Sequence, residues 1–228
     1  MAAEAGGWQH GVAWSRPLVA GMAEHPGVRV IDGRKLKITT PGRVLYPATG
    51  TTKTVVLDFY AAVAPVMLPH LTGRPATRKR WPECVRRARV LRQGRRTRHP
   101  AWLSKVQIRH RCGPKFYPVF DTPAALVWLG QVAALELHVP QWRIPPPAGP
   151  QPAAVSTTPS TPRLPDRVVF DLDPGPGAGL AECVQVAQAL RERLGALGNR
   201  IVPVTSGSKG LHLYVPMDEP ITSAQATE

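Results

Sequence analysis

Two aspartates separated by one residue are the first side chains in this sequence with evident chemistry. Asp171 and Asp173 follow the apolar run 168–170 and precede Pro174. Because side chains alternate along a strand, both carboxylates project from the same face. Carboxylate oxygens held close together suit a hard divalent cation such as Mg²⁺ or Mn²⁺. The alternative is a polar strand end at which the two aspartates cap the chain or face water.

A glycine-rich segment, TSGSKG at residues 205–210, is the second such element. Its glycines let successive backbone N–H groups turn toward one concavity, where the Ser206 hydroxyl and the Lys209 ammonium complete a phosphate cradle. The GxxxxGK[ST] spacing is absent and no helix follows, so this is not a Walker loop. The next strand alternates, which places His212 and Tyr214 on an open face and the leucines in a core. The alternative is an ordinary turn before a half-buried strand.

The elements that position these residues fall into four regions. Residues 1–27 form a loose N-terminal extension, and 28–143 hold mixed strands and helices. Residues 144–165 are rich in Pro, Ala, Ser and Thr and predict a semi-extended linker. Residues 166–228 follow as strand, helix, strand and strand. Strands alternating with helices give an α/β class.

Periodicity and turn residues place the individual elements. Strands are expected at Val28–Ile31, Lys35–Thr39, Pro75–Trp81, Phe116–Phe120, Leu137–Trp142, Arg167–Asp173, Ile201–Val204 and Leu211–Val215. Helices are expected at Val55–His70, with a kink or an early end at Pro65, and at Ala124–Leu135 and Gly179–Leu197. The last helix is expected to bury a stripe made of Leu180, Val184, Ala187, Leu190, Leu194 and Leu197.

The composition favours a polyanionic partner and an intracellular setting. Net charge is +14 and the pI is near 10.7, as in proteins that bind nucleic acid or an anionic membrane surface. Residues 84–98 hold seven arginines and no acid, which indicates either a phosphate-gripping arm or a solvated loop. No run of 18 apolar residues predicts a membrane span and residues 1–20 do not read as an export signal. Three widely spaced cysteines fit a reducing cytoplasm.

The sequence VVFDLDPG (168–175), a helix, and PVTSGSKGLHLYVP (203–216) together resemble the polymerase domain of bacterial ligase D. That domain is an archaeo-eukaryotic-type primase-polymerase used in end joining. Further matching blocks stand upstream in the same order: RVLYPATGTTK (43–53), GRPATRKRWP (73–82), PAWLSK (100–105) and ALELHVPQW (134–142). The resemblance implies a primase-polymerase-like mixed sheet with flanking helices, whose C-terminal part is missing from this chain.

The resemblance also implies a role for each matching residue. The chemistry would be attack of a primer 3′-hydroxyl on the α-phosphate of a nucleoside triphosphate, at DNA ends or gapped duplexes. A DNA ligase and the end-binding protein Ku are implied partners, in a cytoplasmic, nucleoid-associated setting. The implied residues are Asp171 and Asp173 for Mn²⁺ or Mg²⁺, Ser206, Lys209, Gly210, His138 and His212 for the nucleotide, and Lys53, Lys79 and Arg43 for the DNA 5′-phosphate.

The chain departs from the family pattern in two places. Family members carry a third metal-binding carboxylate on a later strand, and this sequence ends at Glu228 before that position. Residues 83–99 lack the paired aromatics that stack on the template, and we interpret them as an Arg-rich insert or an altered segment, such as a shifted reading frame produces. We therefore expect weak or absent polymerase activity.

Two other functions remain open on the sequence. One is a non-catalytic module that binds DNA ends by their 5′-phosphate. The other is a haloacid-dehalogenase-like phosphatase, which also places Asp-x-Asp after an apolar strand. In that family the lysine lies well beyond the Ser/Thr, whereas Lys209 follows Ser206 by three residues.

Overall fold

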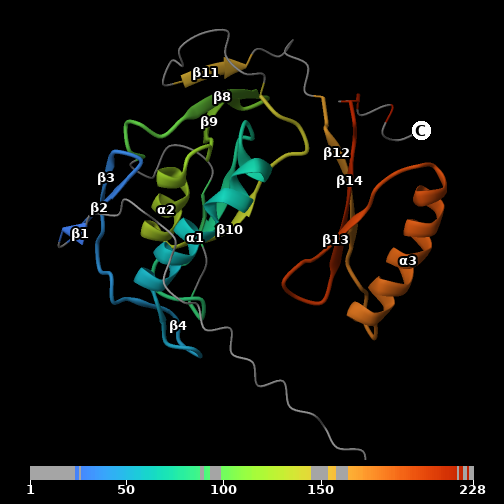
Figure 1. Cartoon of the computed structure of the whole chain (residues 1–228), viewed down its shortest axis with the longest axis horizontal. Coiled ribbons are helices and arrows are strands. Elements are labelled where there is room, and N and C mark those ends of the chain that lie inside the picture. The colour runs from blue at the N-terminus through green and yellow to red at the C-terminus, as the bar shows by residue number, and fades with distance from the viewer. Residues whose placement is uncertain are drawn as a thin grey trace, which may run out of the picture.

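The computed structural model describes residues 24–25, 27–87, 90–92, 99–144, 154–157, 164–219, 221–222 and 225. Figure 1 shows two parts joined at one end. We call the described residues up to 144, with strand β11 (Ala154–Thr157), the N-terminal lobe, and residues 164–219 the C-terminal lobe. Strands and helices mix in both lobes, so the predicted α/β class is confirmed.

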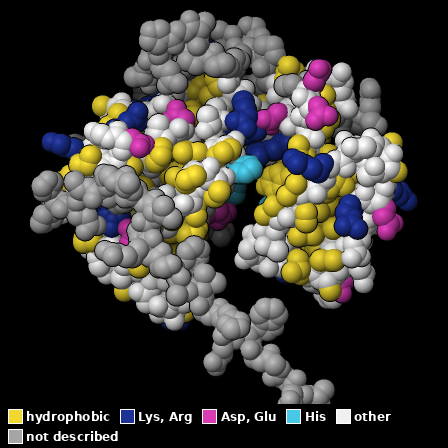
Figure 2. Space-filling view, in the orientation of Figure 1, with side chains coloured by type: hydrophobic (Ala, Val, Ile, Leu, Met, Phe, Trp, Pro, Cys, Tyr) yellow, Lys and Arg dark blue, Asp and Glu magenta, His cyan; other side chains and the backbone are white. Residues whose placement is uncertain are grey.

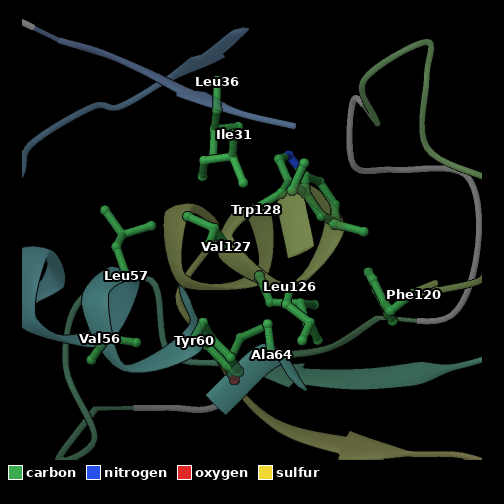
Figure 3. Close-up of a cluster of buried hydrophobic side chains, with 14 of the residues drawn as sticks. Ile31, Leu36, Val56, Leu57, Tyr60, Ala64, Phe120, Leu126, Val127 and Trp128 are labelled. Atoms are coloured by element: carbon green, nitrogen blue, oxygen red, sulfur yellow. The ribbon is translucent and has the colours of Figure 1, made fainter. Parts of the chain in front are cut away.

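Two crossing helices form the centre of the N-terminal lobe. Helix α1 (Lys53–Leu71) packs across α2 (Pro123–Gln131), in which every residue from Ala124 to Gly130 is buried. The helices approach closely at Gly130, where a β-carbon would lie 3.1 Å from Leu57 Cδ2. Figure 3 shows the side chains of this core, with Tyr60 and Leu126 at the crossing. By length and composition alone α1 could cross a membrane, but a core helix passes the same test.

Short antiparallel strands surround these helices. One sheet has the order β1-β2-β3 and a smaller one pairs β4 with β5. Another has the order β10-β6-β7, and in the last, β11-β8-β9, β11 runs parallel to β8. The bounds are β1 Glu24–His25, β2 Val28–Ile31, β3 Arg34–Lys37, β4 Val44–Tyr46, β5 Thr51–Thr52, β6 Thr77–Arg80, β7 Val90–Arg92, β8 Lys105–His110, β9 Gly113–Pro118 and β10 Ala134–His138.

The C-terminal lobe is one antiparallel sheet covered on one face by a helix. The strand order is β12 (Arg167–Leu172), β14 (Leu211–Pro216) and β13 (Val202–Thr205). Helix α3 (Leu180–Ala196) packs on this sheet through Cys183 and Ala187. The opposite face of the sheet carries Asp171, His212 and Tyr214 and has no helix over it in the described part of the chain (Figure 1).

Three expectations about helices are corrected. The helix expected at Val55–His70 is confirmed as α1, Lys53–Leu71, so only the early end expected at Pro65 is wrong. Helix α2 ends at Gln131 rather than Leu135, because Ala133 adopts a left-handed φ of 50° and β10 starts at the next residue. The predicted leucine stripe of α3 is wrong at Leu180, Val184 and Leu197, which are exposed. The stripe is confirmed at Ala187, which is buried, and at Leu190, which packs against the same core, while Cys183 meets the sheet although it was not expected to.

The strand and linker predictions also need correction. The strand expected at Leu137–Trp142 is β10, which ends at His138. Within the expected linker, residues 145–153 and 158–163 lie outside the described residues, but β11 joins β8 as an edge strand. Within the Arg-rich segment, β7 pairs with β6. Residues 88–89 and 93–98 of that segment, and the expected extension up to residue 23, lie outside the described part.

Candidate nucleotide and DNA-end site

The strand β12 presents Asp171 on the open face of the C-terminal sheet. Asp171 is the register partner of His212 in β14, and Asp171 Oδ1 lies 3.2 Å from His212 Nε2. The Asp171 side chain is 63% exposed, whereas Leu211 and Leu213 on the other face are buried. The alternation expected along β14 is therefore observed. It leaves a carboxylate and an imidazole side by side and open to solvent.

Asp173 lies just beyond β12 and faces the glycine-lysine turn. A β-carbon built on Gly210 would stand 2.9 Å from Asp173 Oδ1, 2.9 Å from the Leu172 carbonyl oxygen and 3.1 Å from Ser206 Oγ. Gly210 is buried even though residues 205–209 are exposed. The structure thus brings the aspartate pair and the turn together, and only a residue without a side chain fits at their point of contact.

The turn between β13 and β14 is closed by two reciprocal hydrogen bonds. The Gly210 N–H donates to Ser206 Oγ at 3.2 Å, and the Ser206 N–H donates to the Gly210 carbonyl at 3.1 Å. Gly207 has a φ of 85°, which the turn requires and which a residue with a β-carbon resists. From α3, the buried Cys183 thiol donates to the Leu172 carbonyl at 3.4 Å, so the helix supports the strand end from below.

A second group of charged side chains lies on neighbouring strands of the N-terminal lobe. Glu136 in β10 is the register partner of Lys79 in β6, and the same carboxylate oxygen, Oε1, contacts Lys79 Nζ and lies 2.6 Å from His138 Nε2. Burial raises the pKa of Glu136, but the hydrogen bonds from Lys79 and His138 outweigh it and lower the pKa overall. Lys79, expected at the DNA 5′-phosphate, and His138, expected in the nucleotide pocket, are thus held by the same carboxylate.

Lys53 belongs to a different cluster of cations. Its side chain is buried and donates from Nζ to the Thr39 carbonyl at 2.7 Å. Burial lowers the pKa of Lys53, and the charges of Arg43 and Arg80 lower it further. Arg80 and Lys79 are adjacent in β6 and so project from opposite faces of its sheet. The structure therefore pairs Lys53 with Arg43 and Arg80 rather than with Lys79.

Backbone carbonyls hold the cations of this cluster. Arg43 NH1 donates to the Pro82 carbonyl, and Arg80 Nε donates to the Val132 carbonyl at 2.6 Å. Arg43, Lys53 and Arg80 therefore form one group of neighbouring cations, close enough for the charges of Arg43 and Arg80 to lower the pKa of Lys53.

The comparisons identify the family. The family model described as "LigD, primase-polymerase domain" matches residues 52–228. The chain belongs to this family. It is 48% identical over 194 residues to the multifunctional non-homologous end joining DNA repair protein LigD of Mycobacterium tuberculosis, and 43% identical over 207 residues to its counterpart in Mycolicibacterium smegmatis. These alignments cover 85% and 90% of this chain, and 25% of each relative.

A solved structure supports the fold of this primase-polymerase chain. It is similar to the polymerase domain from Mycobacterium tuberculosis ligase D in complex with DNA, with a TM-score of 0.74 and 47% identity. The match covers 84% of this chain and 64% of that one. The chain spans about a quarter of the length of the curated relatives it matches.

The primase-polymerase family implies a divalent metal, and the aspartate pair suits one in its donor chemistry. Asp171 and Asp173 offer anionic oxygens, which Mg²⁺ and Mn²⁺ prefer. Among the residues that the structure describes, no group of three or more acidic, histidine or cysteine side chains is arranged to hold a metal ion. The pair therefore fits as two ligands of a site, not as a complete set.

Three residues near the expected site of this primase-polymerase chain went unnoticed in the sequence. Glu136 stands two residues before His138, so strand alternation alone would have placed both on one face. Strand alternation in β6 would likewise have placed Arg80 on the face opposite to Lys79. Cys183 gave no signal, because its contact with the end of β12 depends on which face of α3 meets the sheet.

Proposed function

We propose that this chain is a nucleotidyltransferase of the primase-polymerase type that acts on DNA ends in break repair. Its family supports this activity, and so do its relatives, which are named as non-homologous end joining proteins. The single observation that carries the proposal is the contact at Gly210, which joins Asp173 to the glycine-lysine turn. In this proposal a nucleoside triphosphate lies against that contact, and a DNA end binds the N-terminal lobe.

In this proposal some residues of the site bind the nucleotide by charge, and others orient the turn that holds it. The Lys209 ammonium and the backbone N–H groups around Gly207 bind the phosphates of the incoming nucleotide, and the Ser206 hydroxyl orients the turn through its bond with Gly210. The imidazole of His212, beside Asp171, offers a hydrogen bond to phosphate or sugar. The open face of the sheet thus selects a compact, highly anionic ligand.

A divalent cation held by Asp171 and Asp173 would supply charge neutralisation for the attacking and leaving oxygens. The described residues offer no third carboxylate to that site. A site with an incomplete ligand set binds its cation weakly, so we propose low turnover for this chain alone.

The DNA-binding half is proposed on the N-terminal lobe. The cluster of Arg43, Lys53 and Arg80 is suited to a 5′-phosphate because its cations are oriented by carbonyls. Lys79 and His138 would join the ligand set only by releasing or sharing Glu136. A DNA ligase and Ku as partners, and a cytoplasmic location at the nucleoid, remain predictions of the family resemblance.

A second candidate is a DNA-end-binding module without catalysis. One observation favours it: the cation cluster is fully assembled in the described part, whereas the aspartate pair lacks a third ligand. No observation favours the phosphatase alternative.

Primer extension on a gapped duplex separates the two candidates. The assay uses Mn²⁺, nucleoside triphosphates and a gap ending in either a 5′-phosphate or a 5′-hydroxyl. Incorporation that needs the 5′-phosphate and is lost in Asp171→Asn, but kept in the matched surface variant Asp218→Asn, supports the transferase. Binding that depends on the 5′-phosphate, with no incorporation by either protein, supports the module. Equal binding to both gaps without incorporation would contradict both.

A further inference from the structure

A carboxylate that no part of the proposed chemistry uses helps to join the two lobes, beside a hydrogen bond from Arg167 Nε to Gln141 Oε1 and a β-bridge between Trp142 and Pro165. Asp166 directly precedes β12 and receives hydrogen bonds from Arg74 NH2 to both of its oxygens, each at 2.6 Å. The Arg74 side chain is only 1% exposed, and its NH1 also donates to the Pro140 carbonyl at 3.0 Å. A buried guanidinium of the N-terminal lobe thus binds the carboxylate of Asp166, near the start of the C-terminal lobe.

A second arginine binds the same carboxylate and ties it to helix α1. Arg143 Nε donates to Asp166 Oδ2 at 2.8 Å. Its other nitrogens donate to the carbonyls of Thr72 and Pro69, at 2.6 and 2.9 Å, where α1 ends. Two arginines with fixed partners therefore determine where Asp166 lies, because neither can swing away without losing its carbonyl.

The backbone of Asp166 holds both strands of the proposed site. Its N–H donates to the Gln141 carbonyl at 3.0 Å, and its carbonyl accepts the Met217 N–H at 3.0 Å. Asp166 leads into β12, which carries Asp171, while Met217 directly follows β14, which carries His212. We call Asp166, Arg74 and Arg143 the clamp. The clamp holds the start of β12 and the end of β14, which are the strand ends farthest from Asp171.

The clamp acts at the base of a lever. Asp171 lies five positions after Asp166, a span of about 16 Å at roughly 3.3 Å per residue. A rotation of about 10° at the clamp would therefore move the Asp171 carboxylate by about 3 Å, when a misplacement of about 1 Å already costs catalysis heavily. Figure 2 shows why such rotation matters: the lobes meet at one end, and an open hollow separates them beyond it.

We propose that Asp166 is a positioning residue, which holds the aspartate-bearing strands at a fixed place relative to the DNA-end-binding lobe. It touches neither the nucleotide nor the DNA. Its function, which rests on the transferase proposed above, is to couple the two binding sites: a DNA end bound to the N-terminal lobe and a nucleotide bound to the C-terminal sheet strengthen each other only while the clamp is closed.

The test compares Asp166→Asn in the full chain with Asp218→Asn, an exposed aspartate just after β14 with the same change of charge. Spin labels on Cys112 and on Gln188→Cys, with Cys84 replaced by Ser in every protein, report the distance between the lobes. We expect one narrow distance distribution in the parent and in Asp218→Asn, and a clearly broadened one in Asp166→Asn. An unchanged distribution in Asp166→Asn would overturn the clamp.

Binding measurements on the same proteins test the coupling. The probes are a fluorescent ATP analogue with Mn²⁺ and a gapped duplex with a 5′-phosphate. We expect each probe alone to bind Asp166→Asn within twofold of the parent, while the several-fold mutual strengthening falls to about one. Retained coupling, or loss of either single affinity by tenfold, contradicts a positioning role.

Two outcomes are kept distinct. If neither probe binds the parent, the proposed transferase fails, and the spin-label distances alone decide whether the clamp fixes the lobes. If Asp166→Asn does not fold, Arg143→Gln takes its place, because it removes one partner of the carboxylate at a side chain that is 42% exposed and leaves the Arg74 pair in place. It should then broaden the distances and weaken the coupling to a smaller extent.

Discussion

Adding one methyl group at Gly210 tests the contact between the aspartates and the turn. In Gly210→Ala the new β-carbon would stand 2.9 Å from both the Leu172 carbonyl oxygen and Asp173 Oδ1. The Asp173 side chain can rotate, but the Leu172 carbonyl is fixed between β14 and the Cys183 thiol. Because ordinary contact begins at 3.4 Å, the strand end and the turn must separate by about half an ångström.

The size of the effect follows from overpacking. Such displacements cost about 1–3 kcal/mol of stability. Loss of one hydrogen bond to a charged phosphate costs roughly 1.5–3 kcal/mol in binding, which is about a tenfold to hundredfold weaker affinity. We therefore expect Gly210→Ala to fold with a lower Tm and to bind a fluorescent nucleoside triphosphate with Mn²⁺ at least tenfold more weakly.

Gly175 provides the matched control for this substitution. It lies two residues after Asp173, its φ is not in the left-handed region, and a β-carbon there would meet nothing within 4 Å. Gly175→Ala should change stability by less than about 0.5 kcal/mol and leave nucleotide affinity unchanged. Equal nucleotide binding by Gly210→Ala and Gly175→Ala, at equal Tm, would refute the assembly of the site at Gly210.

Two further predictions concern the N-terminal lobe. Glu136→Gln removes the charge that holds Lys79 and His138, so binding to a 5′-phosphorylated duplex should tighten several-fold and the slope of log K against log salt should steepen by about 0.9. Fluorescence anisotropy titrations measure both quantities, with Glu192→Gln, which changes an exposed acid on α3, as the control. An unchanged slope in Glu136→Gln would contradict this prediction. Burial, with the charges of Arg78 and Lys105, lowers the pKa of His99 to about 4. The folded state therefore binds fewer protons than the unfolded chain between about pH 6.5 and 4, and stability should fall across that window as pH decreases. The loss of unfolding free energy is on the order of 1–3 kcal/mol after allowance for solvent screening. Urea titrations of the parent and of His99→Gln at several pH values measure it. Parallel pH profiles of the two proteins would contradict this prediction.

Local patterns predicted the chemistry-bearing strands well, because those patterns are set by alternation. The run around His212 places polar side chains on one face and apolar ones on the other, and β14 keeps that arrangement. The glycine-rich turn could be predicted from the sequence equally well. Its geometry depends on Gly207, which has a left-handed φ, and on Gly210, where a β-carbon would collide with its neighbours.

Which residues pack against one another could not be predicted from the sequence in the same way. Of the stripe expected on α3, Ala187 meets the sheet, but Leu180 and Leu197 are exposed, because periodicity gives the presence of an apolar face and not which residues approach closest. The end of α2 at Gln131 falls within a continuous apolar run, where the periods of helix and strand cannot be separated.

Contacts between distant residues could not be predicted from the sequence at all. The pairing of Lys79 with Glu136, and of Arg74 with Asp166, joins residues 57 and 92 positions apart. The family resemblance implied a phosphate contact for Lys79. Its internal carboxylate partner appears only when β6 and β10 are paired.

The measurement that tests the central claim most directly is Mn²⁺-dependent binding of a nucleoside triphosphate to the full chain. Calorimetric or fluorescence titrations would compare the parent with Asp171→Asn, Asp173→Asn and the surface control Asp218→Asn. We expect saturable binding in the parent and in Asp218→Asn that needs Mn²⁺, and a loss of at least tenfold in either of the other two variants. Binding that is independent of Mn²⁺, or that survives both substitutions, would contradict the claim that these aspartates and the glycine-lysine turn form one nucleotide site.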